Sequence, residues 1–584
     1  NTISLLKSDI LVNMKYKFFI LLNFFSLIVF CQNDIKNDLK KIIEEYESFE
    51  HYNKNDFPLG DFSESRFKKE YEFYSKIKDR LSSISLRGLS ENEKISYHLL
   101  VFIIENEINN YKFNIRYNPI LSDSGFHNSI IYNVRDLVNE KDAIRYLELL
   151  KAIPLYVEQN IVLIQKGIDI GISQPKIIFK SYESTYEQHI TKDYKKNYYY
   201  TPFINLPENI KKPLKDSLIL KAQKTITKSV IPSFKKIKCF FEKNYYPYTR
   251  NHISIASTPN GAEYYKNRIK FYTTLDLTAE EIHQIGLDEV KKIRNEMKQI
   301  IKSLNFEGDF EGFINYLRTN KKFYAKTPKE LLMIARDISK RLDEKLPEFF
   351  KILPRKPYGV AAVPDAIAPK YTGGRYIPAS GKSRVSAYYW VNTYDLNSRP
   401  LYTLPALSAH EAVPGHHLQI ALNEEGDKNI PAFRKNFYLS AYGEGWGLYA
   451  ESLADEMGVY TTPYEKFGQL TYSMWRACRL VVDTGIHAFG WSKEKAVDYM
   501  SKNTALSFHE INTEIDRYIS WPGQALSYKI GELKIKELRS KSKKLLAEKF
   551  DIHDFHEVIL ENGTLTLPLL ESQVNKYIYQ KLSN

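Results

Sequence analysis

Apolar side chains recur with helical spacing over most of the chain. Long stretches place them at intervals of three and four residues between Glu and Lys, which is the pattern of helices with one buried face. These stretches are 34–115, 143–170, 207–245, 278–304 and 328–350. In the fourth stretch, Thr278 and Glu281 have the spacing of a capping box at a helix start. The first 350 residues therefore predict an almost entirely helical structure.

Residues 352–400 break this pattern. They are rich in Gly, Pro, Tyr and Ser, and the segment RVSAYYWVNTYD at 384–395 alternates as a strand does. Helical spacing returns from about 403 to 548 and again at the end of the chain. Gly, Pro and Asn interrupt it at three points: 490–491, 521–523 and 562–563. The predicted fold class is mainly α with a small β region.

The N-terminal segment has the pattern of an export signal. Met14 begins a segment in which Lys15 and Lys17 precede the apolar stretch Phe18–Phe30. These thirteen residues are too few to span a bilayer, which needs about 20, but they suit the core of a signal peptide. We therefore expect the protein to be exported to the periplasm or the cell envelope.

The residues around the predicted cleavage point leave two alternatives open. Residues 1–13 are expected to precede the true start, and 14–31 to form the signal peptide. Cys31 follows Phe30, where a lipoprotein signal would normally have a small residue. Either Cys31 is lipidated, which would attach the protein to a membrane, or the signal is cleaved nearby in the ordinary way.

The charge and the cysteine content of the chain limit the kinds of partner that it can be expected to bind. It has 584 residues and a net charge of +13, but its basic runs are short and separated, so we predict no nucleic-acid partner. Of the three cysteines, Cys239 and Cys478 lie in apolar helical segments and are expected to be buried thiols. The sequence carries no signal for an oligomeric state.

The histidines concentrate in the segment HEAVPGHH, residues 410–417. Three of the 13 histidines and one glutamate lie within these eight residues. In the usual zinc-peptidase helix two histidines at i and i+4 bind the metal, and the glutamate between them acts on a water. Here the second histidine follows His410 by six or seven residues. On an unbroken helix a sixth residue lies about 9 Å along the axis, whereas two nitrogens on one Zn²⁺ are at most about 4.2 Å apart.

Pro414 and Gly415 would interrupt this helix, because proline removes a helical hydrogen bond and glycine tolerates unusual dihedral angles. If two residues loop out, His410 and His416 become the metal ligands and His417 lies beside the site. If three are absorbed, His417 replaces His416. In either case Glu411 is the candidate general base.

A third ligand is expected from GEGWGLYAE, residues 443–451. Glu444 and Glu451 are seven residues apart and so share one helix face. We take Glu444 as the ligand and Glu451 as the carboxylate that orients a histidine, with Glu451 as the alternate ligand. Zn²⁺ is the expected metal.

These motifs, with others after them, resemble a known bacterial family. HEAVPGHHLQ, GEGWGLYAE, RLVVDTGIHAFGW (479–491) and RYISWPGQALSYKIG (517–531) resemble the family called domain of unknown function 885. That family is similar to zinc peptidases of the gluzincin type, in particular the thimet-oligopeptidase-like and carboxypeptidase-Taq-like groups. The resemblance implies a large two-lobed helical fold with a central cleft. We expect one domain over 32–584, with an N-terminal lobe at about 32–350 and the metal-site lobe at about 351–584.

The resemblance and the motif together predict zinc-dependent hydrolysis of peptide bonds in oligopeptides, by a metal-activated water with Glu411 as general base. Candidates for oxyanion stabilisation are Tyr528, Arg517 and His487. Each has a structural alternative: helix packing for Tyr528, pairing with Asp483 for Arg517, and a buried core position for His487.

The segment 384–395, with Tyr388, Tyr389 and Asn392, is a candidate strand for pairing with an extended peptide; the alternative is an ordinary strand of a sheet. Two other functions remain open. One is a non-catalytic, metal-containing binding protein of the envelope, and the other is a metal hydrolase of non-peptide amides or esters.

Overall fold

The computed structural model describes residues 37–365, 367–379, 386–426 and 429–583. The predicted signal segment 14–31, with Cys31, and the residues before it lie outside these ranges. Within these ranges, every helix is too short or too polar to cross a membrane.

The described chain divides into two compact units. The first comprises 37–51, Phe67–Tyr111 and 429–436. The second comprises Tyr52–Arg66, 112–426 and 437–583. The lobes expected at 32–350 and 351–584 stay a prediction.

The first unit is helical. Its elements are a helix over 37–48, most of α2 (Glu64–Ser82), α3 (Glu91–Lys112) and α15 (Ala432–Asn436). Arg434 of α15 is buried and donates from its guanidinium to the carbonyl of Asn92 and the hydroxyl of Ser96 on α3. A short segment from late in the sequence is thus fixed to an early helix by charge-assisted hydrogen bonds.

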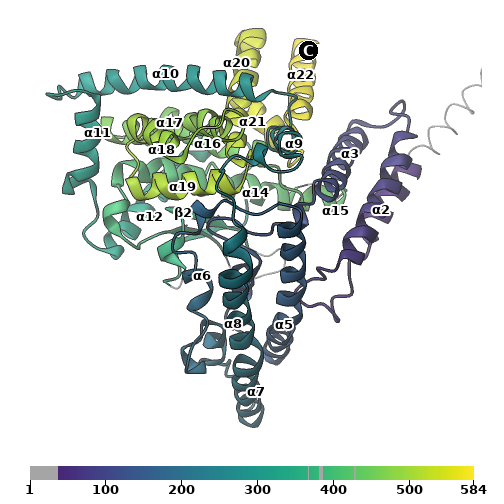
Figure 1. The fold of residues 1–584 in the computed structure, drawn as a ribbon. Coiled ribbons are helices and arrows are strands. Elements are labelled where there is room, and N and C mark those ends of the chain that lie inside the picture. The colour runs from purple at the N-terminus through teal and green to yellow at the C-terminus, as the bar shows by residue number, and fades with distance from the viewer. Residues whose placement is uncertain (1–36, 366, 380–385, 427–428, 584) are drawn as a thin grey trace, which may run out of the picture. The chain divides into compact units, whose positions relative to one another are not determined.

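The second unit begins with a helical part in which α5 packs against α7 and α8 (Figure 1). Asn139 caps α5 by accepting a hydrogen bond from the N–H of Asp142. The helices here are α4 (Phe126–Ser129), α5 (Glu140–Asp169), α6 (Ser184–Glu187), α7 (Lys212–Thr225) and α8 (Ile231–Phe240). The predicted burial of Cys239 is wrong, because α8 buries Ile237 and Phe240 and turns Cys239 to the solvent. Cys478 is buried as predicted.

Four further helices lead from this part to the sheet. The capping box of Thr278 and Glu281 starts α10 as predicted, and α10 packs along α17. These helices are α9 (Gly261–Thr273), α10 (Ala279–Ser303), α11 (Phe310–Thr319) and α12 (Pro328–Lys345).

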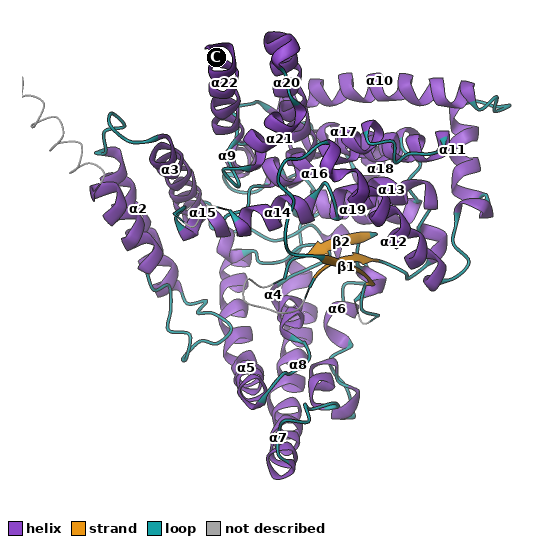
Figure 2. Ribbon diagram, turned by 180° about the vertical axis from the view of Figure 1, so that it is seen from behind, coloured by secondary structure: helices purple, strands orange, loops and turns teal. Residues whose placement is uncertain are grey.

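The predicted β region is a small three-stranded sheet (Figure 2). Its strands are β1 (Tyr358–Ala362), β2 (Gly374–Ile377) and β3 (Ala387–Val391), in the order β1-β3-β2. The central strand β3 runs parallel to β1 and antiparallel to β2. The prediction that a peptide pairs with the strand in 384–395 is therefore wrong, because β1 and β2 occupy both edges of β3. Asn392 is buried, and its amide donates to three loop carbonyls.

The C-terminal part of the second unit surrounds α17, which is buried at every residue from Phe467 to His487. Helix α13 packs on α16 and α17, and α16 packs on α20. The helices are α13 (Leu404–Glu411), α14 (His416–Glu425), α16 (Ser440–Glu456), α17 (Pro463–His487), α18 (Lys493–Asn503), α19 (Phe508–Ser520), α20 (Ser527–Leu546), α21 (Ile552–Leu560) and α22 (Leu567–Ser583). Helices end at all three predicted breaks, and the mainly helical fold with a small sheet is confirmed.

Candidate metal centre

The predicted helix break lies at the proline–glycine pair. Helix α13 ends at Glu411 and α14 begins at His416, with a turn over 412–415 between them. The N–H of Gly415 donates to the carbonyl of Ala409, six residues back. The chain therefore makes a wider turn than an α-helix, and it absorbs the two extra residues as predicted.

Close packing holds this turn in place. A Cβ on Gly415 would lie 2.0 Å from the carbonyl oxygen of His410, so only glycine fits there. The Val413–Pro414 peptide bond is cis. On α16, the buried indole of Trp446 donates from Nε1 to the carbonyl of Pro414 over 2.8 Å. The turn is thereby tied to the helix that carries Glu444.

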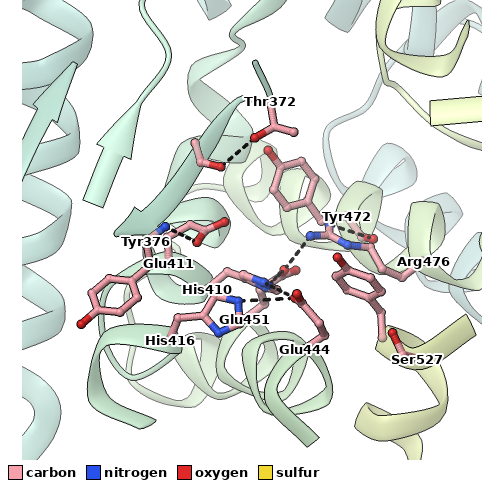
Figure 3. Close-up of polar contacts among 12 residues, drawn as sticks. Thr372, Tyr376, His410, Glu411, His416, Glu444, Glu451, Tyr472, Arg476 and Ser527 are labelled. Carbon is pink, nitrogen blue, oxygen red and sulfur yellow. Dashed lines mark hydrogen bonds and ion pairs between the residues drawn. The ribbon is translucent and has the colours of Figure 1, made fainter. Parts of the chain in front are cut away.

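His410, His416 and Glu444 converge (Figure 3). Their ligand atoms all lie within 4.8 Å of one another. Oε2 of Glu444 is 3.3 Å from Nε2 of His410 and 3.4 Å from Nε2 of His416. Ligands of a tetrahedral zinc with bonds near 2.1 Å are about 3.4 Å apart. The donor set and its spacing therefore fit one zinc ion.

Glu451 orients the first histidine. Nδ1 of His410 donates to Oε1 of Glu451 over 2.8 Å, so Nε2 is the nitrogen turned to Glu444. Nη2 of Arg476, on α17, lies 3.4 Å from the same oxygen of Glu451. This carboxylate–histidine pairing is the usual support of a metal-binding imidazole.

The charges of the centre favour a bound cation. Burial lowers the pKa of His410, but hydrogen bonds and charge from Glu444 and Glu451 outweigh it and raise that pKa to about 10. Burial raises the pKa of Glu444, but His416 and His410 outweigh it and hold that pKa well below its ordinary value. The raised pKa of His410 and the lowered pKa of Glu444 both mean that positive charge is stabilised at this centre.

Three glycines of GEGWG make room for neighbours on different sides of α16. A Cβ on Gly447 would lie 2.6 Å from the ring of His410. A Cβ on Gly445 would meet the backbone of Gly531 on α20, and one on Gly443 would meet the ring of Tyr438. These glycines serve packing around the centre.

The candidate base Glu411 faces the sheet. Its Oε2 accepts a hydrogen bond of 2.7 Å from the backbone N–H of Tyr376 on the edge strand β2. His417 also turns to the sheet, with Nδ1 3.2 Å from the hydroxyl of Tyr376 and its ring 4.6 Å from that of Tyr358. His417 thus contacts the tyrosines and lies outside the His410, His416 and Glu444 cluster.

Tyr528 and Arg517 belong to a neighbouring polar cluster. The guanidinium of Arg517 lies 2.9 Å from the side-chain oxygen of Gln524, 3.5 Å from the hydroxyl of Tyr528 and 3.5 Å from Glu514. The predicted pairing of Arg517 with Asp483 is not formed. Asp483 instead accepts hydrogen bonds from the hydroxyl of Tyr265 and from the N–H of Gly523. These two candidates stay predictions.

His487 is a buried core histidine. Its Nδ1 accepts from the N–H of Ile255, and its Nε2 donates to the carbonyl of Tyr518. Burial lowers the pKa of His487 to about 4. Both ring nitrogens are occupied by the backbone, so the structural alternative describes this residue.

Three residues near the centre escaped the sequence analysis. Arg375, on β2, is exposed, and its charge interacts with those of Glu411 and Glu444. Arg476 holds Glu451, and Tyr438 packs on the residue before Glu444. Arg375 lies in a short strand without a motif. Arg476 lies in the continuous buried run of α17, and no motif in the sequence around it singles it out.

Comparisons with known proteins agree with the predicted resemblance. The family model described as "Bacterial protein of unknown function (DUF885)" matches residues 49–574. The crystal structure of a candidate lipoprotein from Colwellia psychrerythraea is similar over 88% of this chain and 91% of that chain, with 27% identity and a TM-score of 0.84.

A candidate lipoprotein of unknown function from Shewanella oneidensis is similar over 93% of this chain and 98% of that chain, with 19% identity and a TM-score of 0.64. At this identity the likeness concerns the fold alone. No curated protein matches the chain.

Proposed function

The chain belongs to the DUF885 family of bacterial proteins of unknown function, and from its candidate metal centre we propose that it is a zinc peptidase. The observation that carries the proposal is the convergence of His410, His416 and Glu444, with Glu411 on the same turn. Two imidazoles and one carboxylate are the ligands of catalytic zinc sites that keep one position open. A structural zinc would need no extra carboxylate such as Glu411.

Zinc would be held by Nε2 of His410, Nε2 of His416 and the carboxylate of Glu444. When bound, it would acidify a water molecule and polarise the carbonyl of the bond to be cleaved. Glu411 then takes a proton from the attacking water and passes it to the leaving amine. The N–H of Tyr376 holds Oε2 of Glu411, which leaves Oε1 to carry the proton.

Developing negative charge on the substrate needs a donor or a cation nearby. Tyr528 and Arg517 remain candidates, and Arg375 joins them because its charge already interacts with those of Glu411 and Glu444. We drop His487 from this role, since its ring nitrogens are both bonded to the backbone.

An oligopeptide would lie along β2. This strand is at the edge of the sheet, so its outer side can pair with an extended chain. The Tyr376 N–H is already bonded to Glu411, so a peptide that pairs with the rest of this edge would lie next to the base. The two-lobed, gluzincin-like architecture with a central cleft is part of the same proposal.

We also propose that the protein acts at the cell envelope. The predicted signal over 14–31 supports export, and the similar solved structure from Colwellia psychrerythraea, at 27% identity, is of a candidate lipoprotein. If Cys31 is lipidated, the enzyme would be anchored to a membrane.

Metal analysis and peptide digestion test the proposal together. Purified protein should carry about one zinc per chain, cleave members of a peptide library, lose this activity with a chelator and regain it with Zn²⁺. Glu411→Gln should keep the zinc and lower the rate by about 100- to 10,000-fold. The matched control Glu424→Gln, on α14 and paired with Lys356, should retain the rate.

The same assay separates the other functions. Unchanged hydrolysis in Glu411→Gln, or protein without metal that cleaves peptides, would contradict the proposed mechanism. Bound zinc with no hydrolysis of any substrate would indicate the binding protein. Cleavage of chromogenic esters or amides but no peptides would indicate the non-peptide hydrolase.

A further inference from the structure

A cavity of about 170 Å³ lies in the second unit beside the metal centre. Its lining includes Leu407 of α13, Tyr472 of α17 and Gly373 just before β2, which give it a largely apolar wall. Its lining also includes three charged residues, Arg318, Arg399 and Glu510. This volume suits one amino-acid side chain.

The cavity is lined by Leu407 of α13 and by Gly373, just before β2. Leu407 lies four residues, about 6 Å along the helix axis, before Glu411 on α13. A Cβ on Gly374 of β2 would be 3.2 Å from Leu407, while Glu411 accepts from the N–H of Tyr376 on the same strand. Both side chains thus face β2. A peptide paired with β2 and cleaved beside Glu411 would have a neighbouring side chain within reach of the cavity.

Arg399 has unused hydrogen-bonding capacity in this cavity. Its Nε is buried and has no hydrogen-bond partner among the described residues, and its Nη1 makes only a long bond of 3.3 Å to the carbonyl of Ser398. The second arginine there, Arg318, is different: it donates to the carbonyls of Leu506 and Thr504. A buried donor without a partner is costly, so a ligand with an acceptor would be favoured at Arg399.

Glu510 does not supply that acceptor. Arg399 is the cation that acts most on Glu510, yet in the described part of the chain the two form no ion pair within 4.0 Å. Burial raises the pKa of Glu510 to about 7, against the charge of Arg399. Near neutral pH its protonated form can therefore donate a hydrogen bond to a second carboxylate.

We propose that this cavity is the subsite for an acidic side chain, Glu or Asp, next to the cleaved bond, with Arg399 as its counter-charge. A carboxylate would satisfy Nε of Arg399 through a charge-assisted hydrogen bond. The apolar wall at Leu407 would cover the methylene groups of the side chain. A basic side chain would leave Nε of Arg399 without a partner and add a like charge.

This inference rests on the proposed function, because it places the substrate beside Glu411, but binding tests it independently of hydrolysis. Zinc-loaded Glu411→Gln protein is titrated with fluorescent peptides taken from the library. The peptides share one sequence and differ only at one central residue, which is Glu, Gln, Leu or Lys. The Glu peptide should bind at least about tenfold more tightly than the Gln peptide, as expected for a hydrogen bond to a charged group.

Adding Arg399→Gln should remove this preference and leave the affinity for the Gln peptide nearly unchanged, whereas Arg399→Lys should keep part of it. Arg355→Gln, an exposed arginine paired with Glu425, is the matched control and should keep all of it. Thermal unfolding of each variant checks that the fold is retained.

The inference is overturned by equal binding of the Glu and Gln peptides, or by an equal loss for all peptides in Arg399→Gln. The absence of any peptide binding overturns it as well. If the wild-type protein cleaves no peptide, but the Glu peptide binds in a manner that depends on Arg399, the proposed function fails and the acidic subsite stands.

Discussion

At the scale of single residues, Glu451 would act on a bound metal through His410. It accepts a hydrogen bond of 2.8 Å from Nδ1 of His410 and is buried. Glu451→Gln should therefore weaken zinc binding by about 10- to 100-fold, the usual effect of removing such a support. Competition with a zinc chelator of known affinity measures the change. Glu456→Gln, on the same helix and paired with Arg539, should bind zinc like the wild type; equal affinity in both variants contradicts this role.

Gly415 decides whether the two histidines can meet. In Gly415→Ala the new methyl group would lie 2.0 Å from the backbone carbonyl oxygen of His410. Backbone atoms cannot move aside as the end of a flexible side chain can. We expect a loss of about 1–3 kcal/mol in the free energy of unfolding and a low zinc content. Urea unfolding and metal analysis measure these. Gly373→Ala, whose Cβ would have only an ordinary contact at 3.9 Å to Leu407, serves as control, and a full zinc complement in Gly415→Ala would refute the steric argument.

The residues around the centre differ in how far the sequence could indicate them. The break at Pro414 and Gly415 was predictable, because both residues act on the backbone through covalent properties of their own. The role of Tyr376 was not, since it uses a backbone N–H, which every residue except proline has. Arg375 and Arg399 carry charge, but only the tertiary fold brings that charge to the centre and the cavity.

At the scale of elements, Trp446 joins α16 to the turn before α14. Its Nε1 donates to the carbonyl of Pro414, and its side chain is fully buried. Trp446→Phe leaves that carbonyl without its donor, which costs about 1–3 kcal/mol. Because the turn positions His416, zinc content should fall too. The control Tyr442→Phe, also on α16, removes a buried hydrogen bond to the carbonyl of Ile559. It should lower the free energy of unfolding but leave the zinc content unchanged. An equal loss of zinc in the two variants would show that general destabilisation, and not the turn, is the cause.

The sheet marks the limit of element prediction. The alternation of Ala387, Tyr389 and Val391 on the buried face of β3 indicates a strand. A central strand and an edge strand can share that alternation, however. The order β1-β3-β2 depends on how 363–373 and 378–386 cross between strands, which local patterns do not specify. The candidate for peptide pairing therefore moves from β3 to β2.

At the scale of the whole molecule, buried histidines should make the protein less stable in acid. Burial lowers the pKa of His127 and of His556 to about 3, against about 6.5 in an unfolded chain. Below about pH 6.5 the unfolded chain takes up protons that the folded chain does not, so the free energy of unfolding falls as the pH drops. Each residue contributes at most about 1.4 kcal/mol per pH unit. The raised pKa values of His410, Asp483 and Glu510 oppose this effect. The histidines with a lowered pKa are more numerous: His127, His189, His417, His487 and His556. The unfolding temperature should therefore be lower at pH 5.5 than at pH 7.5.

His556 provides the specific check. Its Nε2 accepts from the hydroxyl of Tyr449, and its Nδ1 donates to the carbonyl of Phe349, which fixes the neutral ring. His556→Gln should reduce the proton uptake on unfolding between these pH values by up to one proton, whatever its effect on stability itself. His553→Gln changes a partly exposed histidine on the same helix and is the matched control. An undiminished pH dependence in His556→Gln would count against burial as the cause.

The helical character of the molecule could be predicted because helices repeat a local pattern. The division into two units could not, since the first unit joins 37–51 and Phe67–Tyr111 to the distant segment 429–436. The buried guanidinium of Arg434 makes that connection, and nothing in its neighbourhood along the chain distinguishes it from a surface arginine.

The glycines of α16 have a practical meaning for genome surveys. His410 rests where Gly447 has no side chain, and Gly445 and Gly443 accommodate α20 and Tyr438 in the same way. Larger side chains at these three positions would require His410, α20 and Tyr438 to move in different directions. A single compensating substitution elsewhere could therefore not restore the packing. We therefore expect a homologue with alanine at the position of Gly447 to lack the proposed cation site, even if it retains both histidines and the glutamate.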